Sequence, residues 1–224
     1  YGVELINAQQ SDVILFTGDL VNNLSEEVQP WKQLFAQLQA RDGVYSIMGN
    51  HDYGDYSSWE SPEAKQANIE QLHKLEEEMG WKLLLNTHTY LHLNGERIAL
   101  IGVENWGHGR FSKYGDLTKA MQGIAADDFK ILMSHDPTHW EDIVQPQHKD
   151  IALTLSGHTH GMQCGIEVPG WRWSPAQYIY KHWGGMYQED GQYLNVNRGF
   201  GYHAFPGRIG VWPEITVIEL KTKE

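Results

Sequence analysis

Four short apolar runs along the chain are each followed at once by polar residues. These runs are Val13–Phe16, Val44–Met48, Lys130–Met133 and Ile151–Leu155. Each is too short for a helix, and a short apolar run between polar boundaries predicts a strand that is buried on both faces. We therefore expect four buried strands, each leading directly into a polar loop.

Helical patterns lie between these runs. An apolar stripe extends from Pro30 to Leu38, and Ser61–Pro62 has the form of an N-cap followed by a first-turn proline. After that cap, apolar residues recur at helical spacing as far as Gly80. The stretch Val3–Ala8 is typical of the end of a helix. Strands that alternate with helices in this way predict βαβ units.

Further strands are predicted outside this alternation. Asn94-Gly95, between Thr89–Leu93 and Arg97–Val103, is typical of a hairpin turn, and Tyr193–Val196 and Ile215–Leu220 are predicted as late strands. These segments add antiparallel pairing, so we expect an α/β fold with two sheets. No repeat or linker marks a boundary, and one domain over residues 1–224 is the simplest division.

Composition excludes several classes of protein. The chain has 17 Lys and Arg against 29 Asp and Glu, a net charge of -12, which argues against binding to duplex nucleic acid. Its single cysteine, Cys164, excludes an intramolecular disulfide and a cysteine-rich zinc site. No apolar run approaches the ~18 residues that span a bilayer, so the chain as given is expected to be soluble. It begins with Tyr1, which predicts a piece of a longer product.

Metal-ligating residue types follow the four predicted strands. They are Asp19, Asn50, His135, His158 and His160, with His51 beside Asn50. Ligands collect at the carboxyl ends of strands in open α/β sheets, so we expect these side chains to converge. Oxygen and imidazole donors together suit manganese, iron, cobalt or zinc better than calcium.

These residues form four motifs in a fixed order. They read Gly18-Asp19, Gly49-Asn50-His51-Asp52, Ser134-His135 and Gly157-His158-Thr159-His160. In this set the chain resembles the calcineurin-like metallophosphoesterase family, whose fold is a two-sheet αββα sandwich. The tail, with Asn197-Arg198-Gly199 and residues 208–215, resembles bacterial members that carry membrane helices ahead of the catalytic domain. The resemblance thus implies a membrane-associated bacterial parent protein.

The resemblance also implies a role for each motif residue. Asp19 would bridge two divalent metal ions, and His160 would join it on one of them. The other ion would be completed by Asn50, His135 and His158, and His51 would face the leaving group as an acid or a charge stabiliser. Two neighbouring metals can activate water for attack on a phosphate ester.

The sequence departs from the family pattern at two places. The family's first motif, Asp-x-His after an opening strand, does not precede Val13. We therefore expect a half-complete site, with one metal bound well and the second weakly or not at all. A sheet without its first strand would also expose an edge, which predicts self-association. The second departure is Asn22, which stands where many relatives have a carboxylate that supports the motif histidine. Unless Asp52 or another group replaces that carboxylate, the support of His51 is in doubt.

Several interpretations remain open beside the motifs. Arg198 and Arg208 are candidates for contact with the substrate phosphate or, equally, for surface salt bridges. The aromatic segment Trp171–Trp183 suits a membrane interface, a substrate cleft or a loop folded on its own side chains. We expect a metal-dependent phosphoesterase acting on a mono- or diester. The alternatives are a nuclease on the same fold and a non-catalytic metal- or partner-binding module.

Overall fold

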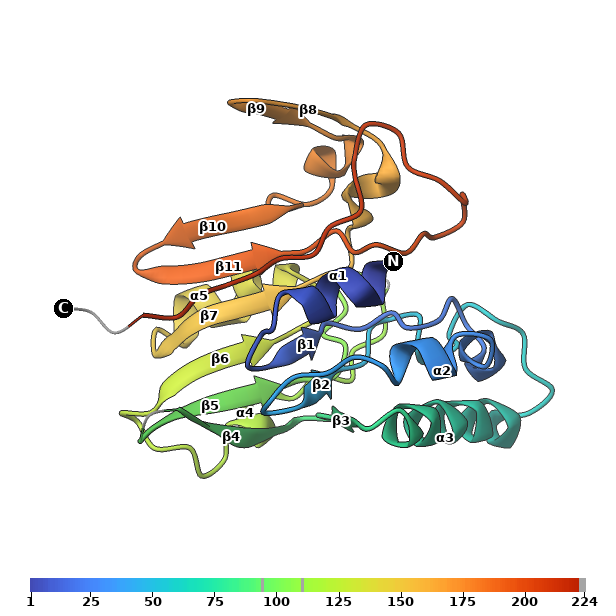
Figure 1. The fold of residues 1–224 in the computed structure, drawn as a ribbon, viewed down its shortest axis with the longest axis horizontal. Helices are drawn as coiled ribbons and strands as arrows, with labels where there is room; N and C mark the ends of the chain where they lie inside the picture. The colour runs from blue at the N-terminus through green and yellow to red at the C-terminus, as the bar shows by residue number, and fades with distance from the viewer. Residues whose placement is uncertain (94, 110, 222–224) are drawn as a thin grey trace.

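Two β-sheets form the centre of the computed structural model, which describes residues 1–93, 95–109 and 111–221 (Figure 1). The smaller sheet is parallel, with β1 (Ile14–Phe16), β2 (Val44–Ser46) and β3 (Trp81–Leu83) in that order. The larger sheet has six strands in the order β10-β11-β7-β6-β5-β4. Its strands β5, β6, β7 and β11 run parallel, and antiparallel β4 and β10 form its two edges.

The strands of the larger sheet include all but one of the remaining predicted strands. They are β4 (Thr87–Leu93), β5 (Glu96–Gly102), β6 (Phe129–Met133), β7 (Ile151–Ser156), β10 (Gly185–Glu189) and β11 (Gln192–Val196). The strands β4 and β5 pair as the predicted hairpin, from Thr87 opposite Gly102 to Leu93 opposite Glu96. Asn94, which was predicted for its turn, lies outside the described residues.

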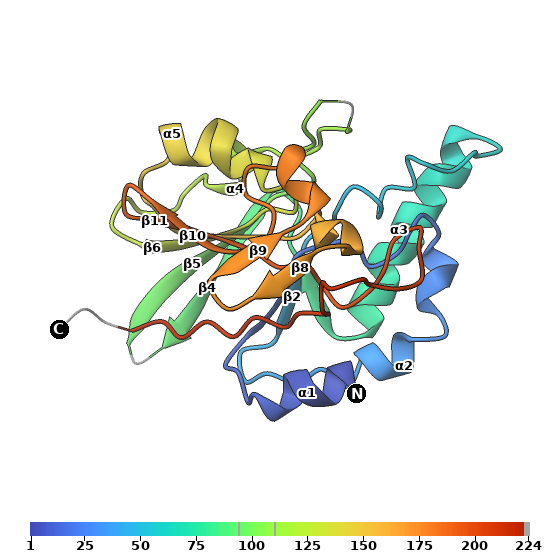
Figure 2. The same cartoon turned by 90° about the horizontal axis from the view of Figure 1, so that it is seen from above.

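Helices cover the outer face of each sheet, as Figure 2 shows. On the small sheet lie α1 (Gly2–Ala8), η1 (Ser25–Val28), α2 (Lys32–Phe35) and α3 (Pro62–Glu78). On the large sheet lie α4 (Leu117–Ala120), η2 (Trp140–Val144) and α5 (Gln145–Gln147). This arrangement of layers is the predicted αββα sandwich.

Three apolar clusters correspond to the three boundaries between these layers. Between the sheets, Tyr45 and Ile47 pack with Leu100, Met133 and Leu155. A second cluster seats α3 on the small sheet, and a third seats η2 and α4 on the large one. Strands of the large sheet bury side chains on both faces of the sheet. Their sequences are therefore apolar at successive positions and do not alternate between apolar and polar residues.

The longest helix, α3, begins and ends as its sequence predicts. The Ser61 hydroxyl accepts a hydrogen bond from the Ala64 N–H over 3.2 Å, and proline follows at the first helical position. Leu72 and Leu75 are fully buried against the small sheet. Gly80, with φ of +81°, ends the helix in the left-handed conformation that glycine favours.

One predicted helix is shorter than its apolar stripe, and one predicted strand is wrong. Within the stripe from Pro30 to Leu38, the helix α2 covers only Lys32–Phe35. Ile215–Leu220 is extended and buries Ile218 partly against the core, but it has no strand assignment. Ile215 and Val217 are exposed, and a strand also requires a hydrogen-bonded neighbour.

Two smaller features bear on partners. Among the described strands, β1 pairs only with β2, so self-association through its other edge stays a prediction. In the part of the chain that the structure describes, none of the helices combines the length and apolar character needed to cross a membrane.

Candidate metal centre

The predicted site residues lie on loops at one end of the two sheets. Because β1 and β2 are parallel in one sheet and β6 and β7 are parallel in the other, each pair presents its carboxyl ends together. Asp19 follows β1, Asn50 and His51 follow β2, His135 follows β6, and His158 and His160 follow β7. The topology therefore gathers residues that are as many as 141 positions apart in the sequence, from 19 to 160.

Two glycines allow the first two loops to touch. A Cβ atom on Gly18 would lie 2.4 Å from the Gly49 nitrogen, and one on Gly49 would lie 2.3 Å from Asp19 Oδ1. Both contacts are far inside van der Waals range, so no larger residue fits at either place. The glycines that precede the motif residues are thus needed for close approach of the backbone.

The carboxylate of Asp52 fastens these loops together. It is buried and accepts hydrogen bonds from the backbone N–H groups of Asp19, Leu20 and Gly49, each over 2.8 Å, and of Val21 over 3.2 Å. Burial and the nearby Asp19 raise the pKa of Asp52 to about 7, although the backbone donors favour its ionised form. Asp52 therefore positions the site by holding the backbone of the two loops. None of these hydrogen bonds involves His51.

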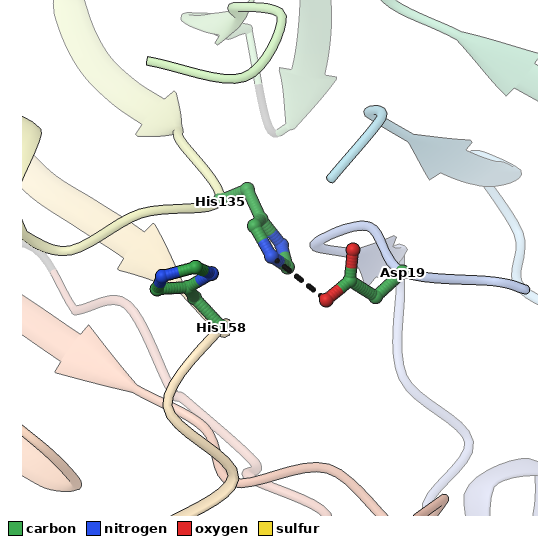
Figure 3. A group of neighbouring side chains, drawn as sticks. All are labelled: Asp19, His135 and His158. Carbon is green, nitrogen blue, oxygen red and sulfur yellow. Dashed lines mark ion pairs between the residues drawn. The ribbon is translucent and has the colours of Figure 1, made fainter. Parts of the chain in front are cut away.

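Asp19, His135 and His158 form the centre of the site (Figure 3). Each offers a ligand atom, and these atoms all lie within 4.8 Å of one another. Asp19 Oδ2 and His135 Nε2 are 3.0 Å apart. The other nitrogen of His135, Nδ1, lies 2.6 Å from the Thr17 carbonyl oxygen, which fixes the ring so that Nε2 faces Asp19.

The charges and contacts of this centre fit a divalent cation. Asp19 Oδ2 and His135 Nε2 are both buried, and neither makes a hydrogen bond of acceptable geometry. Burial opposes the charge of Asp19, but the adjacent His135 holds its pKa well below the usual range. The same pairing outweighs burial at His135 and raises its pKa to about 9. A cation bound by the two atoms would satisfy both of them.

The remaining predicted ligands lie around this centre. Asn50 Oδ1 is 2.7 Å from His158 Nδ1, and His160 Nε2 is 4.0 Å from Asp19 Oδ2. Burial lowers the pKa of both His158 and His160 to about 4, which leaves them as neutral imidazoles, the form that binds metals. The second nitrogen of His158 lies 2.9 Å from the Tyr180 hydroxyl, so ligation by His158 would replace one of its two hydrogen bonds.

The backbone at three of these residues is strained. Asp19, His158 and His160 have φ angles of +60°, +69° and +50°. Non-glycine residues occupy this left-handed region at a cost, and such residues cluster at functional sites. The unusual backbone occurs at residues that carry the proposed chemistry, which supports a functional role for these loops.

His51 is held by a group that the sequence did not identify. Its Nδ1 lies 2.8 Å from the Asn22 backbone carbonyl oxygen, and its backbone N–H donates to Asp19 Oδ1 over 3.0 Å. The Asn22 side chain plays no part in that contact, because its amide donates to Glu27 over 3.0 Å. A backbone carbonyl thus orients His51 in this chain through its Nδ1.

Residues that the motifs did not include surround this histidine. The ring centroids of Tyr56 and His203 lie 4.8 and 4.4 Å from that of His51. The Gln163 side chain positions the loop of His203, since its amide donates to the carbonyl oxygens of Phe205 and Gly207 over 2.7 and 2.8 Å. The sequence indicates His203 only as one of two histidines in glycine-rich loops, with His108, that are candidates for a pocket. Gln163 carried no signal beyond its place three residues after His160.

The two candidate phosphate-binding arginines have structural partners. Arg198 forms ion pairs with Glu167 and with Glu214, the latter at 2.5 Å. Arg208 donates to the carbonyl oxygens of Arg198 and Gly201 over 2.8 Å each. A third bond reaches the carbonyl oxygen of His160 over 3.4 Å, so Arg208 is the one beside the centre. Contact with a substrate phosphate stays a prediction for both.

Known structures share this fold. The chain aligns with a 5'-nucleotidase precursor from Thermus thermophilus at a TM-score of 0.51 and 13% identity, over 88% of this chain and 41% of that one. It aligns with the sulfate thiohydrolase SoxB from the same species at a TM-score of 0.52 and 11% identity, over 87% and 35%. At this identity the likeness concerns the fold alone.

Closer relatives are found by sequence. The uncharacterized metallophosphoesterase YkuE from Bacillus subtilis (strain 168) is 30% identical over 220 residues, which are 97% of this chain and 70% of that protein. A transmembrane protein with metallophosphoesterase domain from Danio rerio is 30% identical over 235 residues, or 98% of this chain and 48% of the relative. The chain thus spans between about half and 70% of the length of these relatives.

Residues 3–162, which contain all four motifs, match the model of the calcineurin-like phosphoesterases. The chain belongs to the calcineurin-like phosphoesterase family.

Proposed function

We propose that the chain hydrolyses a phosphate mono- or diester with the help of divalent metal ions. The observation that carries this proposal is the convergence of Asp19, His135 and His158, whose ligand atoms lie within 4.8 Å of one another at the carboxyl ends of strands from both sheets. Family membership supports phosphoester hydrolysis as the class of reaction.

Four residues would hold the first ion. Asp19 and His135 offer buried atoms without hydrogen bonds, and His158 and Asn50 approach from the opposite loops. Asp19 and His160 would hold a second ion. When bound, such ions supply a Lewis acid for the phosphate oxygens and lower the pKa of water.

His51 would supply a proton to the leaving group. With Nδ1 bonded to the Asn22 carbonyl, the imidazole keeps its second nitrogen, Nε2, for the substrate. A positioned imidazole of this kind contributes about 10²–10⁴-fold as a general acid. The neighbouring rings of Tyr56 and His203 pack against the imidazole and restrict its movement.

The direct test is hydrolysis of p-nitrophenyl phosphate and bis(p-nitrophenyl) phosphate by the purified chain with manganese or zinc. His51→Gln and Asp19→Asn should each reduce turnover by about a hundredfold or more. His92→Gln, at an exposed position on β4, serves as the matched control and should keep full activity. Equal turnover in the two site variants and the control would refute the assignment. A preference for the diester would direct attention to single-stranded nucleic acid, the nuclease alternative.

A non-catalytic metal-binding module is the second candidate. It is favoured by the donor count, because in the described chain the second ion would have only Asp19 and His160, whose facing atoms are 4.0 Å apart. We therefore propose one tightly bound ion per chain. Metal analysis after gel filtration should give about one equivalent of metal. Two equivalents would contradict the half-complete site, and one equivalent without turnover would favour the binding module.

We also propose that the domain works beside a membrane as part of a longer protein. Support comes from relatives that are named transmembrane proteins and are about twice as long as their match to this chain. Fractionation of cells that express the full-length gene product tests this directly, with the protein expected in the membrane pellet. Recovery in the soluble fraction would refute it.

A further inference from the structure

A short hairpin stands apart from the two main sheets. Its strands β8 (Ile166–Val168) and β9 (Trp171–Trp173) pair with Ile166 opposite Trp173, Glu167 opposite Arg172 and Val168 opposite Trp171. Side chains alternate between the faces of a strand, so the outer residues of each strand share one face and the two central residues share the other. One face of the hairpin is thus entirely apolar and the other is charged.

The two charged residues contact the body of the protein, although both are exposed. Glu167 pairs with Arg198, and the guanidinium of Arg172 lies 5.1 Å from the ring centroid of Trp183 and 5.3 Å from that of Tyr187. Both charges are therefore engaged by internal partners. This reverses the usual arrangement of an antiparallel pair, in which the apolar face packs on the core.

Three of the four residues on the apolar face are exposed to solvent. Ile166 and Val168 are each 51% exposed and Trp171 is 55% exposed, whereas Trp173 is half-buried. Tyr178 and Ile179, shortly after the hairpin, are exposed at 76% and 64%. In Figure 1 the hairpin forms the end of the molecule farthest from β4, beyond β10. Exposed apolar surface of this kind on a projecting element marks an interaction site.

We propose that the apolar face of the β8–β9 hairpin docks into the interfacial layer of a neutral lipid bilayer. Tryptophan and tyrosine favour this layer because they combine an apolar ring with a polar group. The face offers no charge to attract anionic lipid, and the net charge of the chain, -12, opposes it. The inference deepens the proposed membrane association and rests on it for the presence of a bilayer.

The size of the face argues against a second copy of the chain as its occupant. The hairpin presents four apolar side chains, whereas a stable protein interface takes about 20–30 residues from each partner. Partial insertion into lipid needs no such area, because each buried side chain contributes independently. A narrow, projecting apolar element therefore fits a bilayer better than the flat surface of a folded partner.

Flotation with phosphatidylcholine vesicles tests the proposal on the chain itself. The wild-type chain should float with the vesicles, and Val168→Glu combined with Trp171→Glu should reduce the bound fraction by about fivefold or more. Trp31→Glu is the matched control, since Trp31 is 56% exposed beside α2 and lies outside the hairpin. Circular dichroism and thermal unfolding establish that all variants fold, and the control should bind like the wild type.

Three results would overturn the proposal. They are failure of the wild-type chain to float, equal binding by the hairpin variant and the control, and binding that requires anionic lipid. A dimer in light scattering that the hairpin variant abolishes would likewise replace the bilayer with a second copy. These outcomes concern the isolated chain, so they are separate from the fractionation of the full-length protein that tests membrane association.

Discussion

The backbone N–H of Asp19 donates a 2.8 Å hydrogen bond to Oδ2 of Asp52, and the same oxygen accepts from Gly49 over 2.8 Å. Through one buried carboxylate, the loop after β1 is held against the loop after β2. The candidate metal ligands Asp19 and Asn50 stand on those two loops. Their separation therefore depends on a residue that makes no contact with the proposed substrate.

Asp52→Asn should weaken both the fold and the metal centre. An amide NH₂ in place of an oxygen faces backbone N–H groups and leaves some of them unpaired, which costs about 1–3 kcal/mol. Urea unfolding should show a loss of that size, and calorimetric titration with Mn²⁺ or Zn²⁺ should show weaker binding. Asp127→Asn, at an exposed position, should change neither quantity. Wild-type metal affinity in Asp52→Asn would contradict the positioning role.

His203→Ala should reduce the proposed hydrolysis without loss of stability. The ring of His203 packs 4.4 Å from that of His51 but is itself exposed, so its removal frees the neighbouring imidazole at little cost to the core. We expect a fall of about tenfold in kcat with little change in KM, a fraction of the contribution of a full general acid. Tyr202→Ala, on the same loop, should retain activity. An unchanged kcat in His203→Ala would show that His51 needs no such support.

Substitutions of Arg198 and Arg208 should have different effects. Arg198→Met breaks ion pairs with Glu167 and Glu214 that are largely shielded from water, so it should destabilise the fold by about 3 kcal/mol. Inhibition by inorganic phosphate should not change in that variant. Arg208→Lys, beside His160, should instead weaken phosphate inhibition. If phosphate inhibition is the same in Arg208→Lys and the wild type, Arg208 has no contact with the phosphate.

Glu76 should make stability depend on pH. It is 2% exposed on α3, and the hydroxyl of Ser46 donates to it. Burial raises the pKa of Glu76 from 4.5 to about 8, so between these values the folded chain holds a proton that the unfolded chain releases. This contribution to the free energy of unfolding is therefore complete below about pH 4.5 and is lost as the pH rises to about 8. The loss amounts to about 1.4 kcal/mol for each pH unit.

Glu76→Gln resembles the protonated carboxyl at every pH. Its stability relative to the wild type should rise from about pH 5 to about pH 8, which urea unfolding at several pH values measures. Glu77→Gln, at the exposed neighbouring position, should remain parallel to the wild type. A constant difference between Glu76→Gln and the wild type would mean that Glu76 is ionised in the folded chain.

The sandwich and the convergence of the motif loops could be predicted from the sequence and its resemblance to a family. Runs such as Ile151–Leu155 are apolar at successive positions because both faces of β7 are covered, and parallel strands bring their polar ends together. The strand predicted at Ile215–Leu220 was wrong because a sequence pattern describes a single segment, whereas a β-ladder needs hydrogen bonds between two neighbouring segments. The stripe after Pro30 is a different case, because its helical spacing continues beyond Phe35, where the helix ends.

The supporting contacts of the site could not be predicted in this way. Every residue has a backbone carbonyl, so the sequence could not predict that the carbonyl of Asn22 contacts His51. The side chain at position 22 indicated only that the usual carboxylate is missing. Asp52 stands next to His51 and was named as one group that could support it. In the structure its side chain is turned toward four backbone N–H groups, and only the three-dimensional path of both loops determines that direction.

The bond between His135 Nδ1 and the Thr17 carbonyl links residues 118 positions apart and joins the two sheets. Such a contact forms only after a long stretch of chain has been ordered, which is slow compared with the formation of helices and hairpins. A chain with complete secondary structure but separated sheets would give a normal circular dichroism spectrum and still lack the pocket for a cation. Metal uptake during refolding would therefore report the moment at which the two halves of the sandwich meet.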